Sequence, residues 1–133
     1  MSTLKHQLMR HEGFRDLPYH CSSGKLTIGY GHNLEKPISQ KAAEQILMDD
    51  MLEARKDCFK VFPDLDTFSQ GRQDAFVNMM FNLGLTRFKG FKKMVKAIQD
   101  RDWERAGDEA YDSLWRKQVK GRATEIIEMI RQG

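Results

Sequence analysis

Three side chains near the start of the chain could do chemistry together: Glu12, Cys21 and Thr27. Glu12 is followed by Gly13, which we expect to end a short helix. A carboxylic acid at such a junction, partly shielded from water, can serve as a general acid. Considered alone, however, Glu12 fits an exposed glutamate at a helix end better.

Cys21 follows His20 and precedes the turn-forming run Ser-Ser-Gly at 22–24. It has three interpretations: a buried filler, a reactive thiol, or a substitute for another residue type. A turn is a poor place for a core residue. His20 and His32 offer bases for a Cys–His nucleophile, although neighbours along a strand point to opposite faces.

Thr27 opens the run T-I-G-Y-G-H, and by itself it would be ordinary sheet filler. The glycines at 29 and 31 lack the rest of any nucleotide-binding motif. The sequence has no Cys/His cluster with zinc-ligand spacing. We therefore expect neither a metal nor a cofactor.

The elements around these residues change character along the chain. Leu4, Leu8 and Met9 have helical spacing and predict a helix over 3–11, with Ser2 or Thr3 as its N-cap. Short β-prone runs between residues 17 and 31, split by the Ser-Ser-Gly turn, predict a hairpin or small antiparallel sheet.

The rest of the chain is predicted to be helical. Ser39 should cap a helix of about 20 residues whose apolar stripe runs toward Cys58 and Phe59. Ser69 should start an apolar helix that ends at residues 82–84. Further helices are expected over 88–99, 102–113 and 121–131. The fold class is therefore α+β: one domain over 1–133, with a small N-terminal β lobe joined by the long helix to a larger helical lobe.

Composition agrees with a globular domain. Hydrophobic residues make up 40% of the 133 residues, and 22 Lys and Arg against 19 Asp and Glu leave a net charge of +3. This mild basicity is too small to indicate nucleic-acid binding. Two cysteines do not make a disulfide framework, and no run approaches the length of a membrane span. The N-terminus lacks the pattern of a signal peptide.

The spacing E-x8-C-x5-T, together with T-I-G-Y-G-H, resembles the catalytic region of the phage-type lysozymes. These endolysins, related to the lysozymes of T-even phages, form glycoside hydrolase family 24, and their triad is Glu, then Asp or Cys, then Thr. The resemblance covers nearly the whole chain; the stretch between β lobe and long helix is shorter here. Its other segments are NMMFNLG at 78–84, GF at 90–91, RDWERA at 101–106 and SLWRKQVKGRA at 113–123.

The resemblance implies a lysozyme-like fold with a cleft between the lobes, and a muramidase that hydrolyses the β-1,4 bond between N-acetylmuramic acid and N-acetylglucosamine. Glu12 would be the acid, and Cys21 would occupy the second acidic position. A thiol there could hold the attacking water with Thr27, or act as a thiolate by stabilising sugar charge or attacking directly. An ordinary thiol pKa of about 8.5 favours the first role.

The same resemblance assigns supporting residues. Arg122 would pair with Glu12, and His32 would meet Asp50 across the lobes in a structural pair. Phe81 could equally be a core residue, and Trp103 and Trp115 are expected to pack in the core or at the hinge. The substrate-binding residues implied are Asn33, Phe81 and Asn82.

Two other function classes stay open at this point: a cysteine peptidase or amidase with Cys21 as nucleophile, and a noncatalytic wall-binding module. The peptidase would need a positioned histidine and leaves the spacing of Glu12 and Thr27 unexplained, and the wall-binding module would have lost its second acid. For a muramidase, the partners are the glycan strands of peptidoglycan, with no nucleic acid, no stable membrane anchor and a monomeric state. Lacking a signal peptide, the protein would wait in the host bacterial cytoplasm until a holin opens the inner membrane to the periplasm.

Overall fold

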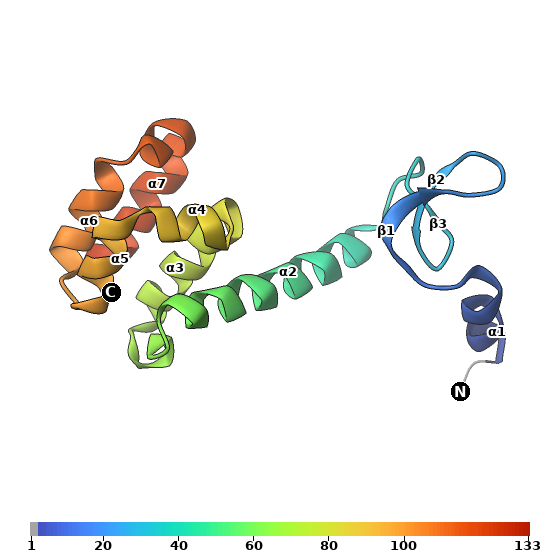
Figure 1. Ribbon diagram of the computed structural model, residues 1–133, viewed down its shortest axis with the longest axis horizontal. Helices are drawn as coiled ribbons and strands as arrows, with labels where there is room; N and C mark the ends of the chain where they lie inside the picture. Colours follow the sequence, from blue (N-terminus) through green and yellow to red (C-terminus); the bar gives the residue numbers. More distant parts are fainter. Residues whose placement is uncertain (1–2) are drawn as a thin grey trace. The chain divides into compact units, whose positions relative to one another are not determined.

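The computed structural model describes residues 3–133 and divides the chain into two compact units, one through Gln45 and one from Ile46 to Gly133 (Figure 1). Each unit is described by itself. Among the described residues, the first unit holds one helix and a three-stranded sheet, and the second is helical. The predicted α+β class is confirmed.

Helix α1 spans Thr3–Glu12 and ends as predicted. The N–H of Gly13 donates to the carbonyl of Met9 at 2.9 Å, and its φ of +70° is the left-handed conformation that glycine adopts at a helix end. The N-cap expected at Ser2 lies outside the described residues, and Thr3 is the first helical residue.

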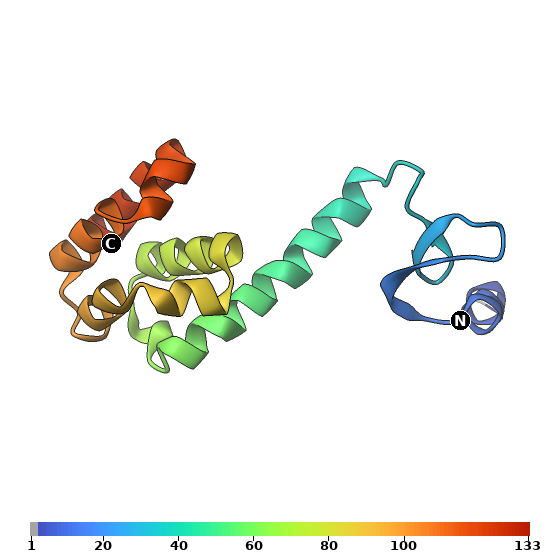
Figure 2. The same ribbon diagram turned by 45° about the horizontal axis from the view of Figure 1, so that its top comes forward.

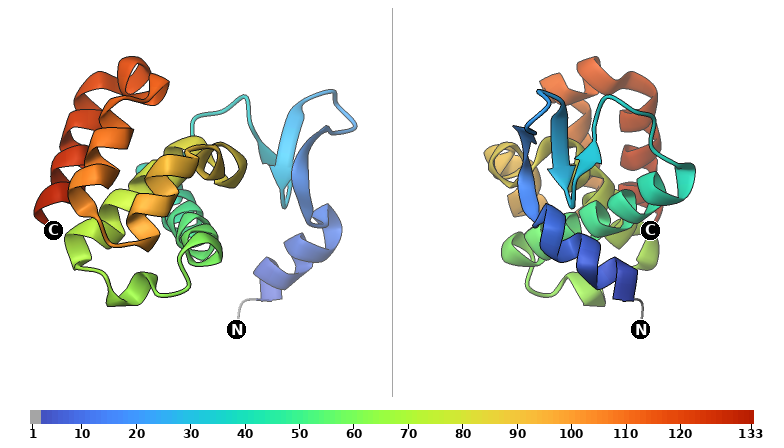
Figure 3. Two further views of the ribbon diagram at one scale, coloured as in Figure 1. Left: turned by 60° about the vertical axis from the view of Figure 1, so that its left-hand side comes forward. Right: turned by 90° about the vertical axis from the view of Figure 1, so that its right-hand side faces the viewer.

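Three strands follow: β1 (Arg15–His20), β2 (Leu26–Gly29) and β3 (His32–Asn33). They form an antiparallel sheet in the order β1-β2-β3 and lie side by side in Figure 3. Thr27 in the central strand faces Tyr19 on one side and Asn33 on the other. The expected hairpin is confirmed, and its loop contains Cys21.

Helix α2 spans Gln40–Val61 and begins as predicted, because Ser39 Oγ accepts the N–H of Ala42 at 3.1 Å. The predicted apolar stripe is only partly buried. Ala54, Cys58 and Val61 reach the core, whereas Ile46 and Leu52 are 54% and 59% exposed. The reason is that the second unit packs on the C-terminal end of this helix.

The second unit continues with a 3-10 turn (Leu65–Thr67), α3 (Gln70–Leu83), α4 (Leu85–Gly90), α5 (Lys92–Gln99), α6 (Trp103–Tyr111) and α7 (Leu114–Gln132) (Figure 2). Ser69 caps α3 and Gly84 ends it, as expected. Aromatic rings fill the core of the second unit: the ring of Phe62 lies 5.6 Å from that of Phe76 and 5.9 Å from that of Phe88.

One helix prediction was wrong in its bounds. The helix expected over 88–99 is two helices, because Phe91 leaves helical geometry at φ −81° and ψ 65°. The helix expected over 121–131 is confirmed as the C-terminal part of α7, whereas the part that begins at Leu114, where Ser113 Oγ accepts the N–H of Arg116, was not predicted. A kink at Lys120 then divides α7.

Candidate active site

Glu12 is the last residue of α1 and is exposed. Its carboxyl group lies against Gly31, in the turn that joins β2 to β3; a Cβ on that glycine would stand 2.6 Å from Oε2. The T-I-G-Y-G-H run therefore leaves room for the carboxyl by ending its turn in glycine. The shielding expected for Glu12 between the lobes involves both units and stays a prediction.

Cys21 begins the loop between β1 and β2. Its N–H donates to the carbonyl of Lys25 at 3.0 Å, and its own carbonyl accepts the N–H of Gly24 at 2.8 Å. Gly24 has a φ of +80°, which fits a three-residue hairpin loop that ends in a left-handed residue. The loop thus fixes the backbone of Cys21 and leaves its thiol partly exposed.

Hydrogen bonds lower the pKa of the Cys21 thiol to about 7. The Ser23 hydroxyl, 3.2 Å from the sulfur, makes the largest contribution. Backbone groups of Lys25 and Ser23 lower this pKa further, burial opposes them, and the Thr27 hydroxyl contributes least. At neutral pH a large fraction of Cys21 is therefore thiolate, whereas a thiol with the ordinary pKa would be mostly neutral. The role of Cys21 as a thiolate is correspondingly favoured.

Thr27 is buried in the sheet, with 3% of its surface exposed. Its hydroxyl donates to the carbonyl of Lys25 at 2.8 Å, and that same carbonyl accepts the N–H of Cys21. One peptide oxygen thus ties the two residues together. Because a hydroxyl has one proton, Thr27 Oγ1 retains its lone pairs as acceptors.

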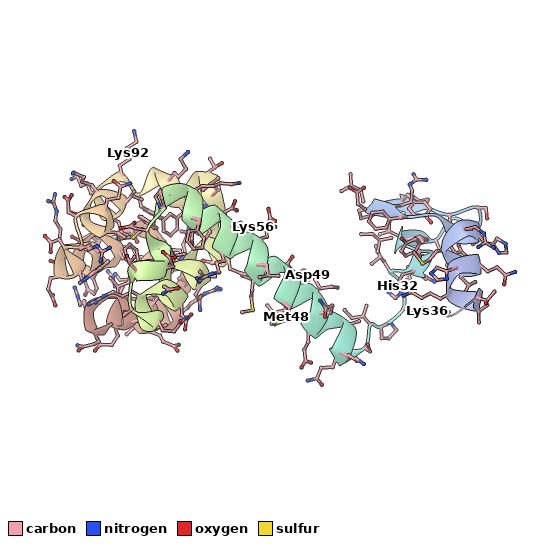
Figure 4. The ribbon with its side chains drawn as sticks, turned by 90° about the horizontal axis from the view of Figure 1, so that it is seen from below. His32, Lys36, Met48, Asp49, Lys56 and Lys92 are labelled. Atoms are coloured by element: carbon pink, nitrogen blue, oxygen red, sulfur yellow. The ribbon has the colours of Figure 1, made fainter. Side chains whose placement is uncertain are left out.

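Neither histidine considered as a base bonds the thiol. His20 is exposed on β1 and pairs in register with Leu26. His32, labelled in Figure 4, is exposed on β3 and pairs in register with Ile28. The side chain that meets Cys21 is Ser23. The arrangement is that of a thiol held in a polar loop.

Asn33 lies on β3, opposite Thr27. Its Oδ1 accepts the N–H of Glu35 at 2.9 Å and shapes the loop after the strand. The amide oxygen is therefore engaged, and a contact from Asn33 to a sugar would use its NH₂ group.

The remaining predicted residues belong to the second unit. Arg122 on α7 binds Asn78 on α3 through both the side-chain and main-chain oxygens, at 2.9 and 3.2 Å. Its expected partner Glu12 belongs to the first unit, so that pair stays a prediction, as does the pair of His32 with Asp50. Asp50 is exposed on α2.

A groove of about 320 Å³ on the second unit brings Arg122 beside Phe81. Phe81 is 43% exposed, so it lines a surface instead of filling the core. The groove places a cation, a carboxylate and an aromatic ring among aliphatic side chains. It is lined by Leu47, Met51, Asp74, Val77, Asn78, Phe81 and Arg122.

Asn82 has a structural task. Its Oδ1 accepts the indole N–H of Trp115 at 2.7 Å, and Trp115 is buried, as expected for a core tryptophan. Trp103 is partly buried and packs at right angles to Phe68, with 5.2 Å between the rings. Substrate binding by Asn82 stays a prediction.

Cys58 differs from Cys21 in its burial and in the direction in which its pKa is shifted. It is fully buried on α2, and burial raises the pKa of its thiol to about 12. Both cysteines are free thiols. Cys58 is a core residue.

Residues 3–133 contain no cluster of metal-ligating side chains and no helix long and apolar enough to span a membrane. Sequence reasoning missed three residues of the site: Ser23, Gly31 and Asn78. The S-S-G turn and the glycine spacing carried a signal for the first two, whereas Asn78 becomes visible only through its contact with Arg122.

A helix that ends in a carboxylic acid, followed by a small antiparallel sheet with a polar hairpin loop and then by a helical unit, is the architecture of lysozyme-like glycosidases. The chain matches the family described as Phage lysozyme over residues 9–132, and it belongs to that family. It is accordingly a glycosidase of the lysozyme class that acts on cell walls.

Three relatives illustrate the similarity. An endolysin from Acyrthosiphon pisum secondary endosymbiont phage 1 is 30% identical over 94% of this chain and 86% of its own length. Probable T4-type lysozyme 1 of Dictyostelium discoideum is 25% identical over 100% of this chain and 96% of its own. The pre-baseplate central spike protein Gp5 of Enterobacteria phage T4 is 29% identical over 98% of this chain, which spans only 28% of that protein.

Proposed function

We propose that this chain is a muramidase that cleaves the β-1,4 bond between N-acetylmuramic acid and N-acetylglucosamine in peptidoglycan. The observation that supports it most directly is the arrangement of its three key residues within one unit. Cys21 and Thr27 share the Lys25 carbonyl, and Glu12 lies beside the turn that follows the strand of Thr27.

In the proposed reaction, Glu12 donates its proton to the leaving glycosidic oxygen as the C–O bond breaks. Water bonds to the anomeric carbon and passes a proton to the Cys21 thiolate. Thr27 orients that water by accepting its other hydrogen, because its own proton is donated to Lys25. Attack by water in a single displacement inverts the anomeric configuration.

The hairpin loop also supports Cys21 as a substitute for aspartate. An aspartate at the start of a turn accepts the backbone N–H two residues later. The backbone of Ser23 is that group here, and it is among those that lower the pKa of Cys21. The loop is thus suited to an anion, whether carboxylate or thiolate.

The remaining assignments are proposals on the same footing. Asn33, Phe81 and Asn82 would contact the glycan, Arg122 would pair with Glu12, and His32 with Asp50. The enzyme would act as a monomer without a cofactor, pass from the host cytoplasm to the wall after a holin opens the inner membrane, and lyse the host.

Product analysis on purified peptidoglycan tests the function. New reducing ends, released as the inverted anomer, are expected. New amino groups would instead indicate a cysteine peptidase or amidase, and binding without product would indicate a wall-binding module. The peptidase has the weaker support, because the Cys21 thiol meets Ser23 and no histidine bond to it is present among the described residues.

A further inference from the structure

We propose that Ser23 is a positioning residue for Cys21: its hydroxyl donates a hydrogen bond to the thiolate and holds the sulfur in place on the hairpin loop. This assignment deepens the muramidase function proposed above and rests on it. It concerns a residue two positions after Cys21, in the turn that fixes the Cys21 backbone.

The geometry supports a direct bond. Ser23 Oγ lies 3.2 Å from Cys21 Sγ, and for a neutral thiol either atom could be the donor. Once the thiol is ionised, sulfur has no proton, so Ser23 must donate. A hydrogen bond to the charged form favours that form, and this bond is the largest contribution to the lowered pKa of Cys21.

The other groups near the sulfur lower the pKa of Cys21 less than the Ser23 hydroxyl does. Two of them are backbone groups, those of Lys25 and Ser23, which remain in place whatever the side chains at these positions. The Thr27 hydroxyl already donates to the Lys25 carbonyl at 2.8 Å. Among the side chains, Ser23 therefore contributes most to the lowered pKa of Cys21 and Thr27 contributes least.

The matched control is Ser22, which is exposed in the same turn and does not bond the sulfur. Ser22→Ala removes an equal hydroxyl one residue closer in sequence. Ser23→Thr keeps the hydroxyl. The titratable and charged residues of β1, the loop and the segment that begins with β3 are unchanged in all variants; they are Arg15, Asp16, Tyr19, His20, Lys25, His32, Glu35 and Lys36.

The experiment measures the rate of alkylation of the full chain by iodoacetamide as a function of pH. Cys58 is fully buried and its thiol pKa is raised to about 12, so the reaction reports on Cys21. We expect a midpoint near pH 7 for the unmodified protein. In Ser23→Ala the midpoint should rise by about one unit, which makes alkylation at pH 7 about fivefold slower.

Ser22→Ala and Ser23→Thr should keep the original midpoint, and the pH–rate profile of wall cleavage should move with the thiol in Ser23→Ala. Circular dichroism checks folding; if Ser23→Ala does not fold, Ser23→Gly deletes the same hydroxyl and permits any turn backbone.

An unchanged midpoint in Ser23→Ala, or an equal rise in Ser22→Ala, overturns the assignment regardless of activity. A raised midpoint specific to Ser23 supports it, and if the unmodified protein then releases no reducing ends, it is the muramidase proposal that fails.

Discussion

The carboxyl group of Glu12 occupies the space into which a side chain on Gly31 would project. A Cβ at Gly31 would stand 2.6 Å from Oε2 and 2.8 Å from Cδ of Glu12, closer than such atoms approach one another. Gly31 also has a φ of +74°, the left-handed region that favours glycine. This glycine therefore sets both the turn and the place of the proposed acid.

Gly31→Ala should reduce wall cleavage far more than it reduces stability. The new methyl group displaces the end of the flexible Glu12 side chain, and a shift of about 1 Å in a reacting group can cost about 100-fold in rate. The matched control is Gly29→Ala: Gly29 has a φ of +68°, but a Cβ there meets nothing within 4 Å.

Both variants should lose about 1–2 kcal/mol in free energy of unfolding from the positive φ. Turbidity assays on purified walls and denaturant unfolding separate the two effects. Equal activity in the two alanine variants would show that the Glu12 position is not set by Gly31.

Glu12→Gln should abolish wall lysis while the fold is retained. An amide cannot give the leaving oxygen its proton, and general acid catalysis contributes about 10²–10⁴-fold in rate. The measurement is the release of reducing ends, with circular dichroism and thermal unfolding as the check on folding. Substantial cleavage by a folded Glu12→Gln protein would remove Glu12 from the mechanism.

Helix ends were predictable from the sequence because they depend on local chemistry. Ser39 and Ser69 cap their helices through their own hydroxyls, and Gly13 ends α1 through its own backbone. The relationship between Glu12 and Gly31 was not predictable, since it joins a helix to a turn across the sheet. The role of Ser23 was hidden because serine is common in any turn.

The break at Phe91 shows why helix bounds failed where tertiary packing decides them. Phe88 and Met94 are both buried, at 0% and 1% exposure. In one continuous helix, residues six apart point about 120° away from each other. Because the chain leaves helical geometry at Phe91, both side chains reach the core. The local sequence pattern carries no signal for this break.

Thr27→Val should lose most activity with a small loss of stability. The substitution keeps the branched shape in the buried strand and deletes the hydroxyl that we propose orients the water. The lost bond to Lys25 should lower the free energy of unfolding by about 1 kcal/mol, since that carbonyl still accepts the N–H of Cys21. Thr27→Ser is the control, and near-normal turnover by Thr27→Val would return the residue to sheet filler.

Asn82→Ala should act mainly on stability. It leaves the indole N–H of buried Trp115 without its acceptor, and an unpaired buried donor costs about 1–3 kcal/mol. Asn82→Asp keeps an acceptor oxygen and should be milder. Thermal unfolding and KM measured together decide the matter: a raised KM with unchanged stability would assign Asn82 to substrate binding.

Cys21 gives the sharpest test, because its three interpretations predict different outcomes. As a substitute for aspartate, Cys21→Asp should keep lytic activity and Cys21→Ala should be strongly impaired. A peptidase nucleophile would make Cys21→Asp inactive, since that reaction requires sulfur. A filler would leave Cys21→Ala fully active.

The pH dependence of activity gives a second test of the role of Cys21. The thiolate forms as pH rises through about 7, so the activity of the unmodified protein should fall below that pH as the sulfur is protonated. In Cys21→Asp this limb should move several units to acid, because an aspartate has an ordinary pKa of about 3.9. Rates of reducing-end release between pH 4 and 9, on folded proteins, make the comparison. If the limb stays near pH 7 in a folded, active Cys21→Asp protein, the group that titrates is another residue, and the thiolate is not the base in this reaction.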